Sequence, residues 1–90
     1  IASFLEKETI YPMDTYIIHE GGQDDSLFLI EKGSVRLVRY DEEGMPRELM
    51  TLGVGQIFGE LSLITGLPRT CSVISNEECI ILELKKSSFD

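Results

Sequence analysis

Residues 59–73, GELSLITGLPRTCSV, combine the residue types that could bind a small phosphate ester. Arg69 is the only basic residue in positions 48–84, and its planar guanidinium can bind two phosphate oxygens at once. The apolar run after Gly59 predicts one or two helical turns, and the first N–H groups of a helix attract anions. Glu60 would repel a phosphate, so it fits only beside a donor such as a ribose hydroxyl. The stretch therefore predicts a site for a sugar phosphate.

The overall charge of the chain decides between classes of partner. Sixteen acidic residues against eight basic ones give 90 residues a formal charge of -8. Nucleic acid binding needs clustered Lys and Arg, so we expect no direct nucleic acid contact by this piece. An anionic ligand is still compatible with this charge, because distant carboxylates are screened over a Debye length of about 8 Å at physiological salt.

No membrane or metal signal stands out in the sequence. Apolar runs stay well short of the roughly 20 residues of a membrane helix, and no secretory signal is visible, so we expect a cytoplasmic domain without membrane contact. Cys71, Cys79 and His19 are too few and too scattered for a zinc site, so no metal and no cofactor are expected. We predict that the cysteines are small apolar strand residues and that His19 is half-buried on a strand. Adjacent acids such as Asp24 and Asp25 fit a solvated surface.

Short runs of Val, Ile, Leu and aromatic residues between turn signals predict an all-β sandwich or barrel. In the run 34–40 the apolar alternation is disturbed at Val38, which predicts an irregular register there. The predicted strands are Thr15 to His19, Leu27 to Glu31, Val35 to Tyr40, Arg47 to Leu52, Thr70 to Ile74 and Ile80 to Leu84.

Four turn signals punctuate these strands, and each is predicted to join antiparallel neighbours. They are EGGQDD, the pair Lys32 and Gly33, DEEGMP and NEE. At the two ends, SFLEKE is predicted to be the tail of a helix, and KKSSFD a helix start with Ser87 or Ser88 as its cap.

The stretch FGELSLITGLPRTCSV resembles the phosphate-binding cassette of the cyclic nucleotide-binding domain family. That family includes catabolite-activator-type transcription factors, cyclic-nucleotide-dependent kinases and gated channels. The family pattern is Phe-Gly-Glu-Leu-Ala-Leu, a short spacer and Pro-Arg-Ala-Ala-Thr-Val, with the same spacing between Glu60 and Arg69. The segment EGGQDDSLFLIEKGSVRL resembles the family's early strands, so the resemblance covers nearly the whole chain.

The resemblance implies a double-stranded β-helix, or jelly roll, that binds cAMP or cGMP. Arg69 and the backbone of Leu61 and Ser62 would hold the phosphate, and Glu60 would hold the ribose 2′-hydroxyl. The implied ligand-binding residues are Phe58, Gly59, Glu60, Leu61, Ser62, Pro68, Arg69, Thr70 and Cys71.

The choice of base stays open, with cAMP slightly ahead. A hydroxyl at Thr70 resembles cGMP-preferring members, where it can meet the 2-amino group of a syn guanine. Against cGMP, the position matching an arginine of the cGMP kinases is Met50. Cys71 departs from the small residue that is common there, which bears on affinity.

The resemblance also implies how such a domain works. We expect a single domain over residues 1–90, truncated at both ends and lacking the C-terminal lid helix that caps the base. Flanking helices, mostly outside this chain, would transmit occupancy to an attached transcription factor, kinase, channel or transporter, and a homodimer is left open. The domain itself is expected not to be an enzyme.

Two other classes of function remain in view. A domain of the same fold that binds no nucleotide would be an interaction or scaffold module, and direct titration with cAMP and cGMP separates it from a sensor. A cupin-like jelly-roll enzyme would need several metal-ligating histidines, and the chain has one.

Overall fold

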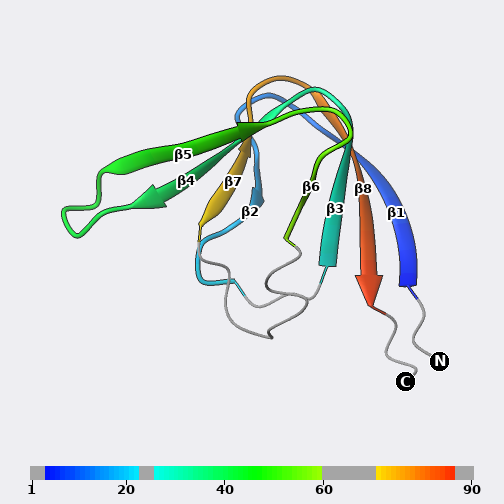
Figure 1. Cartoon of the computed structure of the whole chain (residues 1–90), viewed down its shortest axis with the longest axis horizontal. Helices are drawn as coiled ribbons and strands as arrows, with labels where there is room; N and C mark the ends of the chain where they lie inside the picture. The colour runs from blue at the N-terminus through cyan, green and yellow to red at the C-terminus, as the bar shows by residue number, and fades with distance from the viewer. Residues whose placement is uncertain (1–3, 23–25, 60–70, 87–90) are drawn as a thin grey trace.

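The computed structural model of the chain describes residues 4–22, 26–59 and 71–86, all of whose regular elements are strands. These strands pair into two four-stranded antiparallel sheets that face each other (Figure 1). The strands are β1 (Phe4–Tyr11), β2 (Tyr16–Ile18), β3 (Ser26–Lys32), β4 (Val35–Tyr40), β5 (Pro46–Leu52), β6 (Ile57–Phe58), β7 (Ser72–Ser75) and β8 (Cys79–Lys86). Sheet A has the order β1-β8-β3-β6 and sheet B the order β2-β7-β4-β5.

The hydrophobic core lies between the two sheets. Alternation along β3 turns Phe28 and Ile30 inward, and Ile81 on the neighbouring β8 is fully buried beside them. From sheet B, Val35 and Val73 complete the other side of the core. These side chains are aliphatic or aromatic and β-prone, so the same residues that favour strands also supply the apolar area that holds the sheets together.

Every predicted strand overlaps an observed one, and the all-β fold class is confirmed. The prediction for the first residues was wrong, because residues 4–8 of SFLEKE, where a helix tail was expected, are part of strand β1. This segment pairs along its length with β8, from Phe4 opposite Lys86 to Tyr11 opposite Cys79, and cross-strand pairing outweighs its helix-forming Glu and Lys. The short strand β6 was not predicted. The helix start expected after Lys86, with its Ser87 or Ser88 cap, lies outside the described residues.

The turns correct a second prediction. Only DEEGMP joins neighbours in one sheet, since it links β4 and β5. The segments EGGQDD, Lys32–Gly33 and NEE each carry the chain from one sheet to the other. A turn signal marks where a strand ends, but it does not say which strand becomes the neighbour. This alternation between sheets is what makes the sandwich a jelly roll.

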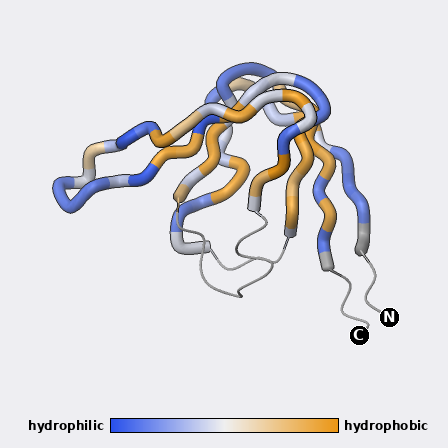
Figure 2. The backbone as a smooth tube through the Cα atoms, viewed as in Figure 1, coloured by the Kyte–Doolittle hydropathy of each residue, from blue (hydrophilic) through white to orange (hydrophobic). Residues whose placement is uncertain are grey.

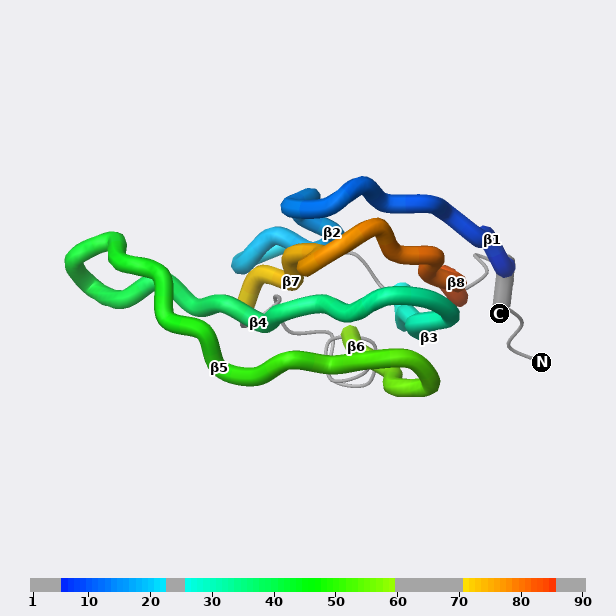
Figure 3. Tube along the Cα trace, turned by 90° about the horizontal axis from the view of Figure 1, so that it is seen from above, coloured from blue at the N-terminus to red at the C-terminus, as the bar shows by residue number. Residues whose placement is uncertain are grey.

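The β4–β5 hairpin extends beyond the rest of the sandwich (Figure 3). Its register shifts between Leu37 and Val38, where Leu37 faces Met50 and Val38 faces Glu48. This β-bulge confirms the irregularity that was predicted at Val38, and a bulge increases the local twist of a strand pair. At the tip, the carboxylate of Asp41 accepts hydrogen bonds from the N–H groups of Glu43 and Met45, at 2.9 Å each.

Four turns between the sheets meet at one end of the sandwich, which we call the corner end. The turns are residues 12–15, 33–34, 53–56 and 76–78. Gly33 allows two of these turns to pack closely on each other. Gly33 has φ +89°, a region that L side chains rarely adopt, and an added Cβ would lie 2.6 Å from the carbonyl oxygen of Glu78 and 2.8 Å from the Sγ of Cys79. The turn from β3 to β4 therefore packs directly on the turn from β7 to β8.

Ser75, at the end of β7, fastens the turn 12–15 to this end of the sandwich. Its side chain is fully buried, and its hydroxyl donates to the carbonyl of Pro12 at 2.6 Å while accepting from the N–H of Thr15 at 2.9 Å. Arg36 adds bonds from its guanidinium to Asn76 Oδ1 at 2.9 Å and Asp14 Oδ1 at 3.1 Å. The corner end is thus held by side chains as well as by backbone pairing.

Candidate functional site

The predicted site is described at its two borders. The structure describes Phe58, Gly59 and Cys71, whereas Glu60, Leu61, Ser62, Pro68, Arg69 and Thr70 lie outside the described residues, as do the predicted helical turns. The structure therefore defines the frame to which residues 60–70 are attached.

The first border is the end of β6, the edge strand of sheet A. Phe58 pairs with Phe28 on β3, and their rings stack with centroids 5.0 Å apart. Phe58 is 4% exposed, so it anchors the start of the cassette in the core. Gly59 follows with φ +87°, a conformation that glycine adopts without strain. The role of this glycine is thus to redirect the chain where β6 ends.

The second border is the start of β7, an inner strand of sheet B. Cys71 is half-buried and precedes Ser72, whose buried hydroxyl oxygen accepts a hydrogen bond from the N–H of Glu20 at 3.0 Å. Glu20 opens the Gly-rich loop after β2, where Gly21 has φ +83°. The loop EGGQDD and the end of the cassette are therefore fastened to each other.

Together these borders define a site end, opposite the corner end. Figure 1 shows the end of β6, the start of β7 and the start of β3 at the same end of the sandwich. The segment 60–70 therefore leaves sheet A and returns to sheet B at this end. A loop carried by two packed sheets is the usual place for a binding site on a rigid scaffold.

Sequence reasoning missed one polar pair at the site end. Ser26, at the start of β3, is 1% exposed, and its hydroxyl donates a hydrogen bond to the Oε2 of Glu83 on β8. The strand register places Lys7 opposite Glu83 and Lys85 opposite Ser26. The signal for Glu83 was its place in CIILELKK, where it occupies an inward position otherwise filled by Cys79 and Ile81.

Two arginines of the described chain are bound elsewhere. Arg36 pairs with Asp14 at 3.1 Å at the corner end, and Arg47 pairs with Asp41 at 3.2 Å at the hairpin tip. These two are structural arginines, the ordinary role of a surface guanidinium in an acidic chain.

Three further residues considered in the sequence, His19, Cys79 and Met50, are described by the structure. The prediction of a half-buried His19 was wrong: the residue is exposed, just beyond β2, and its ring stacks on that of Tyr16 with centroids 5.0 Å apart. Cys79 is fully buried on β8, and burial raises the pKa of its thiol, which disfavours the reactive thiolate. Met50, the position considered for base selectivity, is 52% exposed on β5.

Among the residues that the structure describes, no group of three or more His, Cys, Asp or Glu side chains is arranged to hold a metal ion. Within the same ranges, no helix has the length and apolarity needed to cross a membrane.

Comparison with known proteins identifies the relatives of this chain. The family model of the cyclic nucleotide-binding domain matches residues 8–90. The cyclic AMP receptor protein of Thermus thermophilus is 34% identical over 80 residues, which are 89% of this chain and 37% of that protein. cGMP-dependent protein kinase isozyme 1 of Drosophila melanogaster is 41% identical over 88 residues, which are 92% of this chain and 11% of the kinase.

Solved structures agree with the sequence comparison. The regulatory domain of Toxoplasma gondii PKA, crystallised with cAMP, superposes with a TM-score of 0.85 at 29% identity over 89% of this chain and 30% of its own. The present chain therefore spans well under half of the length of these relatives. A jelly roll with this register and a family match over nearly its whole length lead to one conclusion: the chain belongs to the cyclic nucleotide-binding domain family.

Proposed function

We propose that this domain binds a cyclic mononucleotide through residues 58–71 and acts as a regulatory sensor. In this proposal, Arg69 and the N–H groups of Leu61 and Ser62 bind the cyclic phosphate, and Glu60 accepts a hydrogen bond from the ribose 2′-hydroxyl. A guanidinium and helix N–H groups are well suited to one phosphodiester, because both are donors that complement its negative charge.

The observation that carries this proposal is the frame around residues 60–70. Phe58 is locked in the core at one border, and Ser72 is buried and hydrogen-bonded at the other. Because Phe58 and Ser72 are already held in place, no further ordering of these two borders is needed when a ligand binds, which favours affinity. The remaining members of the proposed site are Gly59, Pro68, Thr70 and Cys71, which shape the turn and the pocket wall.

We further propose that cAMP is preferred over cGMP. In the related cGMP kinases an arginine on the strand before the cassette would meet the guanine edge, and Met50 occupies the matching place on β5. A thioether cannot donate a hydrogen bond to the guanine carbonyl. Thr70 favours cGMP instead, since its hydroxyl can meet the 2-amino group of guanine.

The experiment is titration calorimetry of the 90-residue chain with cAMP and, separately, with cGMP. Saturable binding at one site per chain supports the sensor, and tighter binding of cAMP supports the preference. Thr70→Ala is expected to weaken cGMP alone, and Met50→Arg is expected to strengthen cGMP alone. A folded chain that binds neither nucleotide would instead be an interaction module of the same fold.

The effector of the sensor belongs to the part of the protein beyond this domain. We propose that a cyclic nucleotide shifts the arrangement of helices attached to β1 and β8 and thereby regulates that effector. The first residue of β1 and the last of β8, Phe4 and Lys86, lie opposite each other in sheet A. Segments attached there would start side by side, close enough to move as one unit. A ligand can shift such a unit only by its difference in affinity for the two arrangements.

A further inference from the structure

The outer face of sheet A, which points away from the core, carries apolar side chains on all four of its strands. The register aligns Ile57 on β6, Leu29 on β3, Leu82 on β8 and Glu8 on β1 in one row. Because side chains alternate along a strand and their neighbours Phe28 and Ile81 point into the core, this row points outward. Three neighbouring apolar side chains in a row are unusual on a face exposed to water.

Two further rows flank this one. Leu27 and Leu84 lie opposite each other on its site-end side, and Ile80 and Ile10 lie opposite each other on its corner-end side. Ile10 is 64% exposed, and Ile57, in the first row, is 48% exposed. Figure 2 shows that β3 and the first half of β8 consist largely of hydrophobic residues, beside a largely hydrophilic β1.

Nothing in the described chain covers this face. The two sheets pack on each other through their inner faces, and none of the described elements lies on the outer side of sheet A. The outer face of sheet B differs, because its apolar residues Val38 and Ile74 are buried. On the same face, Tyr16 and Tyr40 are joined by a hydrogen bond between their hydroxyls. An apolar face of this extent on one side of a sheet marks an interaction surface.

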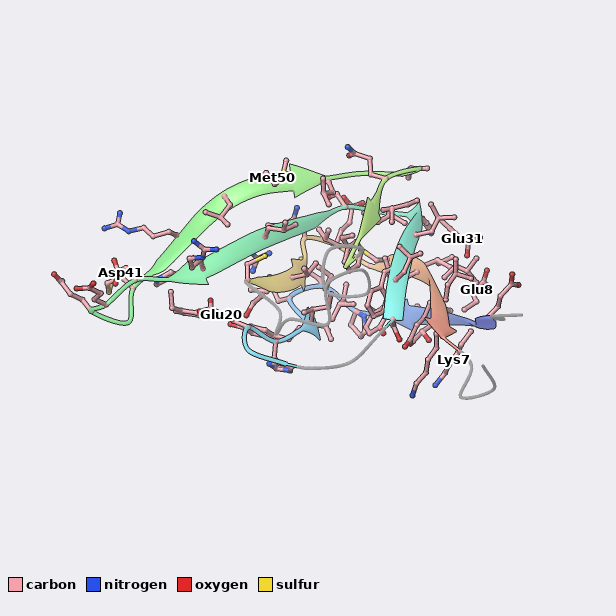
Figure 4. All side chains as sticks on the ribbon, turned by 60° about the horizontal axis from the view of Figure 1, so that its bottom comes forward. Lys7, Glu8, Glu20, Glu31, Asp41 and Met50 are labelled. Atoms are coloured by element: carbon pink, nitrogen blue, oxygen red, sulfur yellow. The ribbon has the colours of Figure 1, made fainter. Side chains whose placement is uncertain are left out.

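Charge on the same face indicates what kind of partner fits. Glu8 on β1 and Glu31 on β3 lie near each other across β8 (Figure 4), and the interaction between their carboxyl groups raises the pKa of Glu31. Glu6 is a third exposed acid on the same face of β1. Lys32 is exposed at the corner-end margin of this face. Two carboxyls held together can accept a cation in place of a shared proton, since a cation relieves their repulsion.

We propose that the outer face of sheet A binds an amphipathic helix whose apolar stripe is flanked by Lys or Arg. The stripe would pack along Leu29, Leu82 and their neighbours, and a basic side chain would lie between Glu8 and Glu31. Helices commonly pack as a layer on the face of a sheet. Apolar residues at positions i, i+3, i+4 and i+7 form a continuous apolar stripe along one side of a helix. This surface is separate from the described borders of the proposed nucleotide site, Phe58, Gly59 and Cys71, which lie at the site end.

The test uses a synthetic 18-residue helical peptide with leucines at that spacing and lysines elsewhere. Titrated into the ¹⁵N-labelled 90-residue chain without nucleotide, it is expected to shift amide signals of β3, β6 and β8. A scrambled peptide of the same composition has the same charge but no stripe, and it is expected to bind at least tenfold more weakly. Equal binding of the two peptides would overturn the proposal, since it would reveal only general attraction to an acidic chain.

Matched variants locate the surface. Leu82→Gln is expected to weaken peptide binding at least tenfold, whereas Leu49→Gln, which changes a leucine that is 52% exposed on β5, leaves it unchanged. Glu8→Gln with Glu31→Gln keeps the strands and removes the charges, so the affinity should fall and become less dependent on salt. Thermal unfolding of each variant verifies that it is folded.

Two results would contradict the proposal that an amphipathic helix binds this surface. One is a set of amide shifts centred on the β4–β5 hairpin, with Leu49→Gln as the damaging variant. The other is self-association of the chain through β8, detected by sedimentation and abolished by Leu82→Gln, because the occupant would then be a second copy. Neither result depends on nucleotide binding, so the proposal and the proposed function fail separately.

Discussion

The two ends of the sandwich are built on different principles. The corner end is filled: Gly33 contacts the turn before β8 so closely that no side chain fits, and the buried Ser75 on β7 is hydrogen-bonded to both ends of the turn 12–15. At the site end, the sheets instead hold the borders of a segment that bears the candidate binding residues. With the proposed function, the difference implies that stability is assigned to the corner end and ligand binding to the site end, so that a variant of one end should spare the property of the other.

The largest expected loss of stability comes from Gly33→Ala. The new Cβ would clash with the carbonyl oxygen of Glu78, and the positive φ adds conformational strain, so we expect a loss of about 2–4 kcal/mol in chemical denaturation. Gly44→Ala is the matched control, because its φ is +81° but nothing lies within 4 Å of its Cβ. That variant should lose only about 1 kcal/mol. Equal losses in the two variants would show that packing at the corner end is unimportant.

The next effect is that of Ser75→Ala. Removing a fully buried hydroxyl leaves the N–H of Thr15 and the carbonyl of Pro12 without this partner, at a cost of about 1–3 kcal/mol. Ser34→Ala removes a hydroxyl bonded to the exposed Glu77 and should cost less in the same denaturation experiment. A larger loss for Ser34→Ala would contradict the order that burial predicts.

A smaller effect concerns the hairpin tip, which belongs to neither end. Hydrogen bonds to the carboxylate of Asp41, first from the N–H of Met45, lower its pKa. A lowered pKa in the folded state means that Asp41 stabilises the fold above its unfolded pKa, near 3.9, and that this contribution is lost as pH falls through the folded value. Asp41→Asn should therefore flatten the fall of the melting temperature with acid. An unchanged acid profile would exclude this contribution.

The smallest expected effect is a gain in stability rather than a loss, and it concerns Glu31. The pKa of Glu31 is raised by its interaction with Glu8, so the folded state favours the protonated acid. Its stabilising contribution is present at low pH and is lost as pH rises through the folded pKa. Glu31→Gln should thus raise the melting temperature slightly at neutral pH and not at low pH. A variant less stable than the parent at neutral pH would mean that the pair is not repulsive.

The sequence predicted the fold better than its connections. Alternation gave the positions of six strands, and the disturbance at Val38 located a real bulge, because both are local properties of the chain. Sheet membership is not local, so the turn at Gly33 could be placed but not assigned to a crossing between sheets. SFLEKE was mistaken for a helix because its pairing partner lies about 80 residues further along the chain.

The candidate site shows the same division. Phe58 and Gly59 were predicted from the motif as ligand-binding residues, and that role stays a prediction. The structure shows Phe58 stacked on Phe28 and Gly59 with a positive φ where β6 ends. The Ser26–Glu83 hydrogen bond at the site end had no motif to announce it, since it depends on two strands that are distant in sequence. Spacing identifies residues that act within one segment, whereas contacts between strands require the register.

The central claim is tested most directly by calorimetric titration of Arg69→Leu with cAMP, alongside the parent chain and Arg36→Leu. Removing the proposed phosphate cation is expected to weaken binding by at least a hundredfold with no change in unfolding temperature. Arg36→Leu, which loses the corner-end bonds to Asp14 and Asn76, is expected to lower the unfolding temperature and to leave the cAMP affinity unchanged. Unchanged cAMP affinity in a folded Arg69→Leu protein would contradict the assignment of the site.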